Sequence, residues 1–222
     1  MISAGNDIIS LSAIDITRTN QQKFYSKILS PEEKEIYNQP GFTSVPFENF
    51  VWLLWSIKEA AYKYLKRHNP GVAFIPVKFV VTELHVPNDY SLTSFGGKQT
   101  EGTGFVNMPV FKGIIKVGDD TIYSNSLIYR ELIFSTVNGD DDFENINWGI
   151  KIIDRVDAEY QSAVVRAFLI DRLQRFFNVD GIVIDKNTGG IPFVLKGGAE
   201  FGVVVSLSHH EEFVGYSFRS QS

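Results

Sequence analysis

Two long helical segments, each followed by short strands, most constrain the fold of this chain. From Phe50 to about Arg67, apolar residues recur at the three- and four-residue spacing of an amphipathic helix, and "HNPG" ends the segment. The segment "DAEYQSAVVRAFLIDRLQRFFNV" shows a second apolar stripe at the same spacing. A helix that is apolar on one face needs another element to cover that face. The sequence therefore predicts two helices that each pack on strands.

The other patterned segments are typical of strands, turns and one short helix. "DIISLSAIDIT" is predicted to be a strand with Asp15 near its end, and "VKFVVTELHV" a later strand. "GIVIDKNTGGIPFVL" and "GVVVSLSHHEEFVGYSF" are predicted to close the chain as three short strands. Residues 87–109 are rich in Gly, Thr and Asn and are expected to form a loop. Ser30 and Pro31 are expected to begin a helix in "LSPEEKEIY".

This order of elements predicts an α+β fold with two similar halves. Each half would be a long helix packed on a small antiparallel sheet, and a pseudo-two-fold axis would relate the halves. The acidic connector "NGDDDFEN" is the best boundary between them. We therefore expect residues 1–147 to form the first half and residues 148–222 the second.

Composition excludes several kinds of function. The 222 residues include no cysteine, so disulfides, thiolate metal sites and a Cys nucleophile are absent. A formal net charge of -5 gives no electrostatic reason to expect nucleic-acid binding. No stretch approaches the roughly 20 apolar residues of a membrane span, and the N-terminus lacks the pattern of a signal peptide. We expect a soluble cytoplasmic protein that binds neither nucleic acid nor membrane.

Three fragments hold most of the candidate site residues, namely Asp15 in "AIDIT", Lys58, Glu59 and Lys63 in "WSIKEAAYK", and Ser208 and His209 in "SLSHH". Each fragment taken singly has a purely structural interpretation. Glu59 and Lys63 would form an ion pair on a solvated helix face, since they are four residues apart. Asp15 would begin a turn, and His209 would be a surface turn residue.

Together the fragments resemble the 4′-phosphopantetheinyl transferase family. Its members show a G-[IL]-D strand, a W-[ST]-x-K-E-[AS]-x-x-K helix and an [NST]-x-[ST]-H strand end, often preceded by G-K-P. The helix motif matches here at every specified position, and the resemblance covers residues 8–67 and 155–218. The chain departs from the family at Ala13 in place of Gly, at Thr17 in place of a frequent second acid, and at Ile191 in place of the Lys of G-K-P.

The order of the motifs differs from that of surfactin-type members, which usually run the Ser-His strand first. This chain runs Asp, Lys-Glu, Ser-His, as the small holo-acyl-carrier-protein synthases do. We interpret it as a pseudo-dimeric transferase with its halves in swapped order, because domain halves tolerate such rearrangement. Such a fused pseudo-dimer is expected to act as a monomer. The alternative is a small synthase with a large insertion after the helix.

The resemblance implies Mg²⁺-dependent transfer of phosphopantetheine from coenzyme A to a serine of an acyl or peptidyl carrier protein. Asp15 and Glu59 would hold Mg²⁺, which prefers oxygen ligands. Lys63 would direct its charge toward the same phosphates. The base that deprotonates the serine would be Glu33 or Glu59.

The resemblance also implies a set of groups that bind the phosphates of coenzyme A, and these are Lys58, Lys63, Ser208, His209 and Arg166. Ile191 removes one expected phosphate contact. The alternative is that Ile191 packs on the donor or the acceptor, or that another cation, such as Lys186 or Lys196, has taken over the role. A non-catalytic protein of the same fold that binds coenzyme A or a carrier protein is the alternative function.

Overall fold

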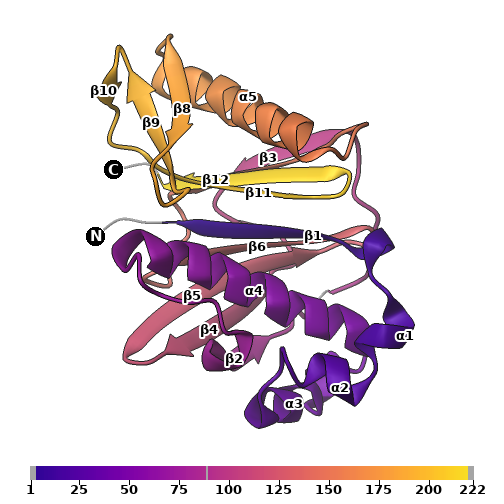
Figure 1. Ribbon diagram of the computed structural model, residues 1–222. Helices are drawn as coiled ribbons and strands as arrows, with labels where there is room; N and C mark the ends of the chain where they lie inside the picture. Colours follow the sequence, from indigo (N-terminus) through magenta and orange to yellow (C-terminus); the bar gives the residue numbers. More distant parts are fainter. Residues whose placement is uncertain (1–3, 89, 220–222) are drawn as a thin grey trace.

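The computed structural model describes residues 4–88 and 90–219 (Figure 1). Within them the chain forms a five-stranded, a four-stranded and a three-stranded antiparallel sheet, and two long helices. The predicted α+β class is therefore confirmed. Residues 1–3, which belong to the N-terminal stretch considered above for a signal peptide, lie outside the described residues. No helix of the described part is long and apolar enough to cross a membrane.

The five-stranded sheet has the order β1-β6-β5-β4-β2, with one long helix, α4, on one face. Its elements are β1 (Gly5–Ser10), β2 (Val80–His85), β4 (Phe111–Val117), β5 (Asp120–Ile128), β6 (Leu132–Asn138) and α4 (Phe47–His68). The apolar stripe of α4, including Phe50, Leu54 and Ile57, is fully buried in the core that it shares with this sheet. That burial against strands confirms the amphipathic pattern seen in the sequence.

Strand β1 lies very close to α4 because Gly5 and Ala60 have little or no side chain at the contact. A Cβ atom added to Gly5 would overlap the carbonyl oxygen of Ala60. Residues of β1 alternate between faces, so Asp7 and Ile9 also face α4, while Ile8 faces the opposite side. This alternation places an acidic side chain directly under the helix.

The four-stranded sheet has the order β11-β12-β7-β3, and the second long helix, α5, lies against it. Its elements are β3 (Gln99–Thr103), β7 (Ile146–Ile152), β11 (Val204–His210), β12 (Phe213–Arg219) and α5 (Ala158–Phe177). The Asp157 side chain caps α5 by accepting from Tyr160 N, and Asn178 ends it in the left-handed conformation. The small third sheet contains β8 (Ile182–Lys186), β9 (Pro192–Lys196) and β10 (Ala199–Glu200).

The two larger sheets pack face to face and also meet along one pair of edges. Ile8 and Phe134 of the first sheet share an apolar cluster with Trp148 and Ile150 of the second, so the layers run α4, sheet, sheet, α5 (Figure 1). Strand β1 runs beside β11, and we call the contact between these two edge strands the seam.

Side chains of β11, rather than its backbone, hold the outer N–H groups of β1 at the seam. Asn6 N donates to Ser206 Oγ at 3.0 Å, and Ser10 N donates to His210 Nδ1 at 2.9 Å. The seam therefore joins the sheets without merging them into one.

Short helices complete the chain, namely η1 (Leu11–Ala13), α1 (Ile16–Thr19), α2 (Gln22–Tyr25), α3 (Pro31–Tyr37), η2 (Pro40–Phe42) and η3 (Pro76–Lys78).

The structure differs in three places from what the sequence led us to expect. The first strand ends at Ser10, so Asp15 caps α1 instead of ending a strand. The expected loop 87–109 contains β3, which pairs with β7. The expected boundary between residues 147 and 148 falls inside β7.

Candidate active site

Two carboxylates and one lysine meet where β1 passes under α4. Lys63 Nζ lies 2.9 Å from Asp7 Oδ1 and 3.5 Å from Glu59 Oε1, and it also donates to the carbonyl oxygen of Asn6 at 3.1 Å. Glu59 and Lys63 stand one turn apart on α4, and Asp7 reaches them from the strand below. The structure thus confirms the Glu59–Lys63 contact and adds a third member.

Burial sets the electrostatics of this cluster. The Asp7 side chain is only 6% exposed. Burial raises the pKa of Asp7 from 3.8 to about 6, Lys63 opposes that rise, and Glu59 adds to it. Burial lowers the pKa of Lys63, but Asp7 and Glu59 outweigh burial and raise it. Asp7 Oδ2 and the Ser56 hydroxyl are both buried and make no hydrogen bond of standard length in the described part of the chain, but Ser56 is near enough to lower the pKa of Asp7. One lysine therefore faces two acids.

The donor set fits Mg²⁺ only if a bound substrate completes it. No group of three or more His, Asp or Glu side chains in the described residues could hold a metal ion. Mg²⁺ often binds through one or two carboxylates, with phosphate and water oxygens as its other ligands. Asp7, with its unpartnered oxygen, and Glu59, with a side chain 31% exposed, match that kind of site.

Lys63 also lines a cavity of about 220 Å³ between α4, the loop from β8 to β9, and β11. Four cations line it: Lys63, Lys66, Arg67 and Lys186. Its remaining lining residues are Tyr62, Gly189, Gly190, Ile191, Pro192, Ser206 and Leu207. None of the lining residues is acidic, whereas four other cavities of the molecule each include at least one Asp or Glu. In a protein of net charge -5, this concentration of positive charge favours an anionic ligand.

Ser208 and His209 lie at the end of β11, and only one of these two side chains lies near the carboxylate cluster. His209 is at the surface, and its pKa is lowered by partial burial of the ring and by nearby Lys63 and Lys186. Ser208 is buried, accepts from Asn6 Nδ2 at 2.6 Å, and donates to the carbonyl of Gly215. His209 thus lies near the cluster, while the Ser208 hydroxyl is used inside the seam.

Glu33 and Lys58 form a fully buried ion pair with an Nζ–Oε2 distance of 2.7 Å. Glu33 also accepts from the main-chain N–H groups of Ser30 and Val81, and Lys58 donates to the carbonyl of Ile28. Burial raises the pKa of Glu33 and lowers that of Lys58, and each partner opposes the shift of the other. Both side chains are sealed from solvent, so neither lies where a substrate would meet it.

Asp15 and Arg166 lie away from Lys63. Asp15 is on the surface, where its side chain accepts from Arg18 N and lines a different cavity with Trp52 and Trp55. Arg166 belongs to α5, on the far side of the sheets from α4 (Figure 1). The structure therefore does not bring these two expected residues into contact with the cluster.

The sequence contains a pattern that points to Asp7, but the comparison with the family motifs missed it. Gly5 and Asp7 have the same spacing as the first and last residues of G-[IL]-D, but Asn6 stands at the position of the apolar residue. Lys66 and Arg67 gave no such signal, because basic residues in the last turn of a helix are common. Lys186 lines the cavity as one alternative to the missing lysine, whereas Lys196 lies over the ring of Phe201.

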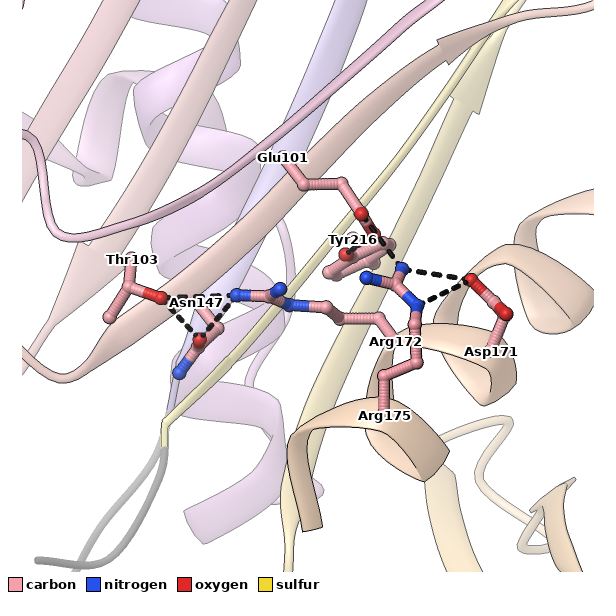
Figure 2. A network of polar contacts seen from close by, with 7 residues as sticks. All are labelled: Glu101, Thr103, Asn147, Asp171, Arg172, Arg175 and Tyr216. Carbon is pink, nitrogen blue, oxygen red and sulfur yellow. Dashed lines mark hydrogen bonds and ion pairs between the residues drawn. The ribbon is translucent and has the colours of Figure 1, made fainter. Parts of the chain in front are cut away.

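A second polar network lies between α5 and the four-stranded sheet (Figure 2). Glu101 of β3 accepts from the Tyr216 hydroxyl with one oxygen and from Arg175 Nη2, at 2.8 Å, with the other. Arg175 also bonds Asp171, and Arg172 donates to Thr103 and Asn147. Burial and the bond to Glu101 raise the pKa of Tyr216 far above its usual range. Both Glu101 oxygens are therefore occupied by partners from the chain itself.

Comparison with known proteins gives a family match for the part of the chain that holds Asp7, Glu59 and Lys63. Neither a curated protein nor a solved structure was found to match the chain. Residues 3–104 match the family model described as the 4′-phosphopantetheinyl transferase superfamily, a superfamily of transferases. Over residues 3–104 the chain is therefore similar to the 4′-phosphopantetheinyl transferase superfamily.

Proposed function

We propose that this protein transfers the 4′-phosphopantetheine group of coenzyme A to a serine of an acyl or peptidyl carrier protein, with Mg²⁺ as cofactor. One observation carries the proposal. Lys63 belongs both to the carboxylate cluster with Asp7 and Glu59 and to the lining of the acid-free cavity. A pyrophosphate in that cavity would lie beside the two carboxylates that would hold the metal ion.

The cations of the cavity would bind the phosphates of coenzyme A, because the neighbouring loop has few donors left. Asn187 Oδ1 accepts from the main-chain N–H groups of Gly189 and Ile191, and its carbonyl accepts from Gly190 N. Those N–H groups are therefore turned away from a ligand. Lys66 and Lys186 have no acidic partner within the described residues and line the cavity, so they are the main candidates.

Asp7 and Glu59 would hold Mg²⁺, in place of the Asp15 and Glu59 pair expected from the sequence. When bound, the ion would neutralise the charge that builds on the pyrophosphate during transfer. Lys63 would keep the two carboxylates together and offer its charge to the phosphates. His209 would donate a hydrogen bond to a phosphate oxygen from the end of β11.

Glu59 would act as the base, since Glu33 is sealed in the interior. The carrier serine oxygen would form a bond to the phosphorus that bears pantetheine, and its proton would pass to Glu59, directly or through one water. The bond from that phosphorus to the oxygen of the adenosine 5′-phosphate would break, and adenosine 3′,5′-bisphosphate would leave.

We also propose that the protein acts as a monomer with its halves in swapped order. The cavity is lined by α4 from the first part of the chain and by the β8–β9 loop and β11 from the last part. One chain thus supplies both walls. The approximate two-fold relation between the two helix-on-sheet units belongs to the same proposal.

The test is mass spectrometry of an apo carrier protein after incubation with coenzyme A, Mg²⁺ and this protein. The expected result is a mass gain of one phosphopantetheine group, lost with Asp7→Asn and retained with Asp15→Asn. A wild-type protein that binds coenzyme A in calorimetry but produces no mass gain would instead be the non-catalytic binding protein. Transfer that survives Asp7→Asn would contradict the assignment of the metal ligand.

A further inference from the structure

Arg67 stands on the same stripe of α4 as Glu59 and Lys63, one turn beyond Lys63, yet it contacts neither acid of the cluster. Its guanidinium instead reaches two main-chain carbonyls of the last part of the chain. Nη1 donates to Pro192 O at 3.2 Å, and Nη2 donates to Val205 O at 2.5 Å. One side chain therefore ties α4 to the start of β9 and to the start of β11.

These two carbonyls belong to the two segments that form one wall of the cation-lined cavity. Pro192 closes the Asn187–Pro192 loop, and Val205 precedes Ser206, which lines the cavity. The two segments lie in different sheets, because β9 is in the small sheet and β11 is the edge of the four-stranded sheet. A planar guanidinium with donors in a fixed fork can hold both carbonyls at once, whereas a lysine ammonium acts as a point charge.

The charge of Arg67 is poorly balanced by the chain. No carboxylate forms an ion pair with Arg67 within residues 4–88 and 90–219. Its Nε is buried without a hydrogen-bond partner, and burial lowers the pKa of the guanidinium. A partly buried cation is costly unless an opposite charge is near. The phosphates of a ligand in the adjoining cavity would be that charge.

We propose that Arg67 is a positioning residue for the phosphate-bearing donor, because its two-carbonyl bridge fixes the Asn187–Pro192 loop and β11 at a set distance from α4. This inference rests on the proposed function for its donor, coenzyme A, but the bridge itself does not. The bridge acts through main-chain atoms, so it sets the width of the cavity whatever side chains the loop carries.

The experiment compares Arg67→Met, which removes the donors and the charge, with Arg67→Lys, which keeps only the charge. Lys66→Met is the matched control, because it removes a cation from the same cavity and the same helix turn without touching either carbonyl. We expect both Arg67 variants to raise the KM for coenzyme A about tenfold or more, with kcat changed by less than about threefold, since Asp7, Glu59 and Lys63 are untouched.

Hydrogen exchange of the loop amides separates positioning from charge. Both Arg67 variants should exchange faster at residues 187–191, and Lys66→Met should not. Full rescue of the KM by Arg67→Lys, or unchanged exchange in Arg67→Met, overturns the positioning role. If wild type neither binds coenzyme A nor transfers, the proposed function fails, while the exchange measurement still tests the bridge. If Arg67→Met does not fold, Arg67→Lys alone decides between bridge and charge.

Discussion

The two long helices each cover a polar network, and the two networks differ in the cavity that each one borders. Under α5, each oxygen of Glu101 accepts a hydrogen bond, and Arg175 bridges Glu101 and Asp171 (Figure 2). Under α4, Lys63 faces two acids, Asp7 and Glu59. In each network one cation thus faces two acids, and each has a buried polar atom without a hydrogen-bond partner in the described residues, Arg172 Nε under α5 and Asp7 Oδ2 under α4. The difference lies beside them, because Lys63 lines a cavity with no acidic lining residue, whereas Asp171 lines one that contains acids.

That difference indicates which of the charged clusters in this fold is the better candidate for a catalytic site. A buried acid whose partners are all internal stabilises the fold, and an incompletely paired one costs stability unless a ligand completes it. Perturbed pKa values occur in both networks, so a shift alone would not separate them. The neighbouring acid-free cavity does separate them.

The largest expected effect is the loss of transfer activity when Asp7, in the network under α4, is substituted. Asp7→Asn should lower the rate of phosphopantetheine transfer by at least about a hundredfold, because a metal-binding group supplies several kcal/mol to a developing phosphate charge. Single-turnover transfer measured by mass spectrometry is the readout. Asp15→Asn, an acid at the surface, is the control and should transfer at the wild-type rate. A similar loss in both variants would remove the distinction between the two aspartates.

The next effect concerns the pH dependence of stability in metal-free buffer. Burial raises the pKa of Asp7 from 3.8 to about 6, so between these values the folded state retains a proton that the unfolded state has released. The contribution of Asp7 to stability is therefore present at low pH and is lost as pH rises through about 6, by up to about 3 kcal/mol. Urea denaturation at pH 4 and pH 7 should show this loss in wild type. A wild-type loss equal to that of Asp7→Asn would contradict the pKa assignment.

A smaller effect is expected when Glu101, in the network under α5, is substituted and compared with Glu59 under α4. Glu101→Gln should lower the free energy of unfolding by about 1–2 kcal/mol, because it weakens a charge-assisted bond to a half-exposed Arg175. Transfer activity should stay within about twofold of wild type. Glu59→Gln should do the reverse, with stability within about 0.5 kcal/mol of wild type and transfer lost. The two variants measured together by urea denaturation and transfer assay test whether the networks have separate roles.

The smallest effect concerns Ile191, where the family pattern has a lysine. A new charge-assisted contact to phosphate is worth about 1.5–3 kcal/mol, but four cations already line this cavity. Ile191→Lys should therefore tighten coenzyme A binding by no more than about threefold at low salt, and less at high salt. Lys186→Ala should weaken it by about tenfold. Calorimetric gains far above threefold for Ile191→Lys would mean that no other cation has taken the place of the missing one.

Local patterns were enough to predict the two long helices, the short helix α3, much of the strand content and part of the site. The apolar spacing of α4 and the cap at Ser30 follow from nearby residues, and both are as expected. Glu59 and Lys63 are one turn apart on a helix, so their contact could also be predicted. The strand β3 could not, because its polar sequence forms a strand only by pairing with β7.

The choice between Asp7 and Asp15 needed tertiary structure. Both lie in an Ile-rich stretch, and each follows a small residue at a spacing of two. What separates them is the end of β1 at Ser10 and the close approach of Gly5 to α4, which turns Asp7 toward the helix. Glu33 shows the same limit, because a glutamate after a capping serine looks exposed in the sequence but is sealed here by Lys58 and Val81.

The seam joins residues that are 200 positions apart, since Asn6 N meets Ser206 and Ser10 N meets His210. Contacts of such long sequence separation form slowly, because the intervening chain loses much entropy when they close. The carboxylate cluster takes its side chains from the first 63 residues, but the strand that carries Asp7 pairs with β6, and the cavity beside the cluster needs β11 as well. During synthesis, the ability to bind a donor therefore arises only once the last strands have been made.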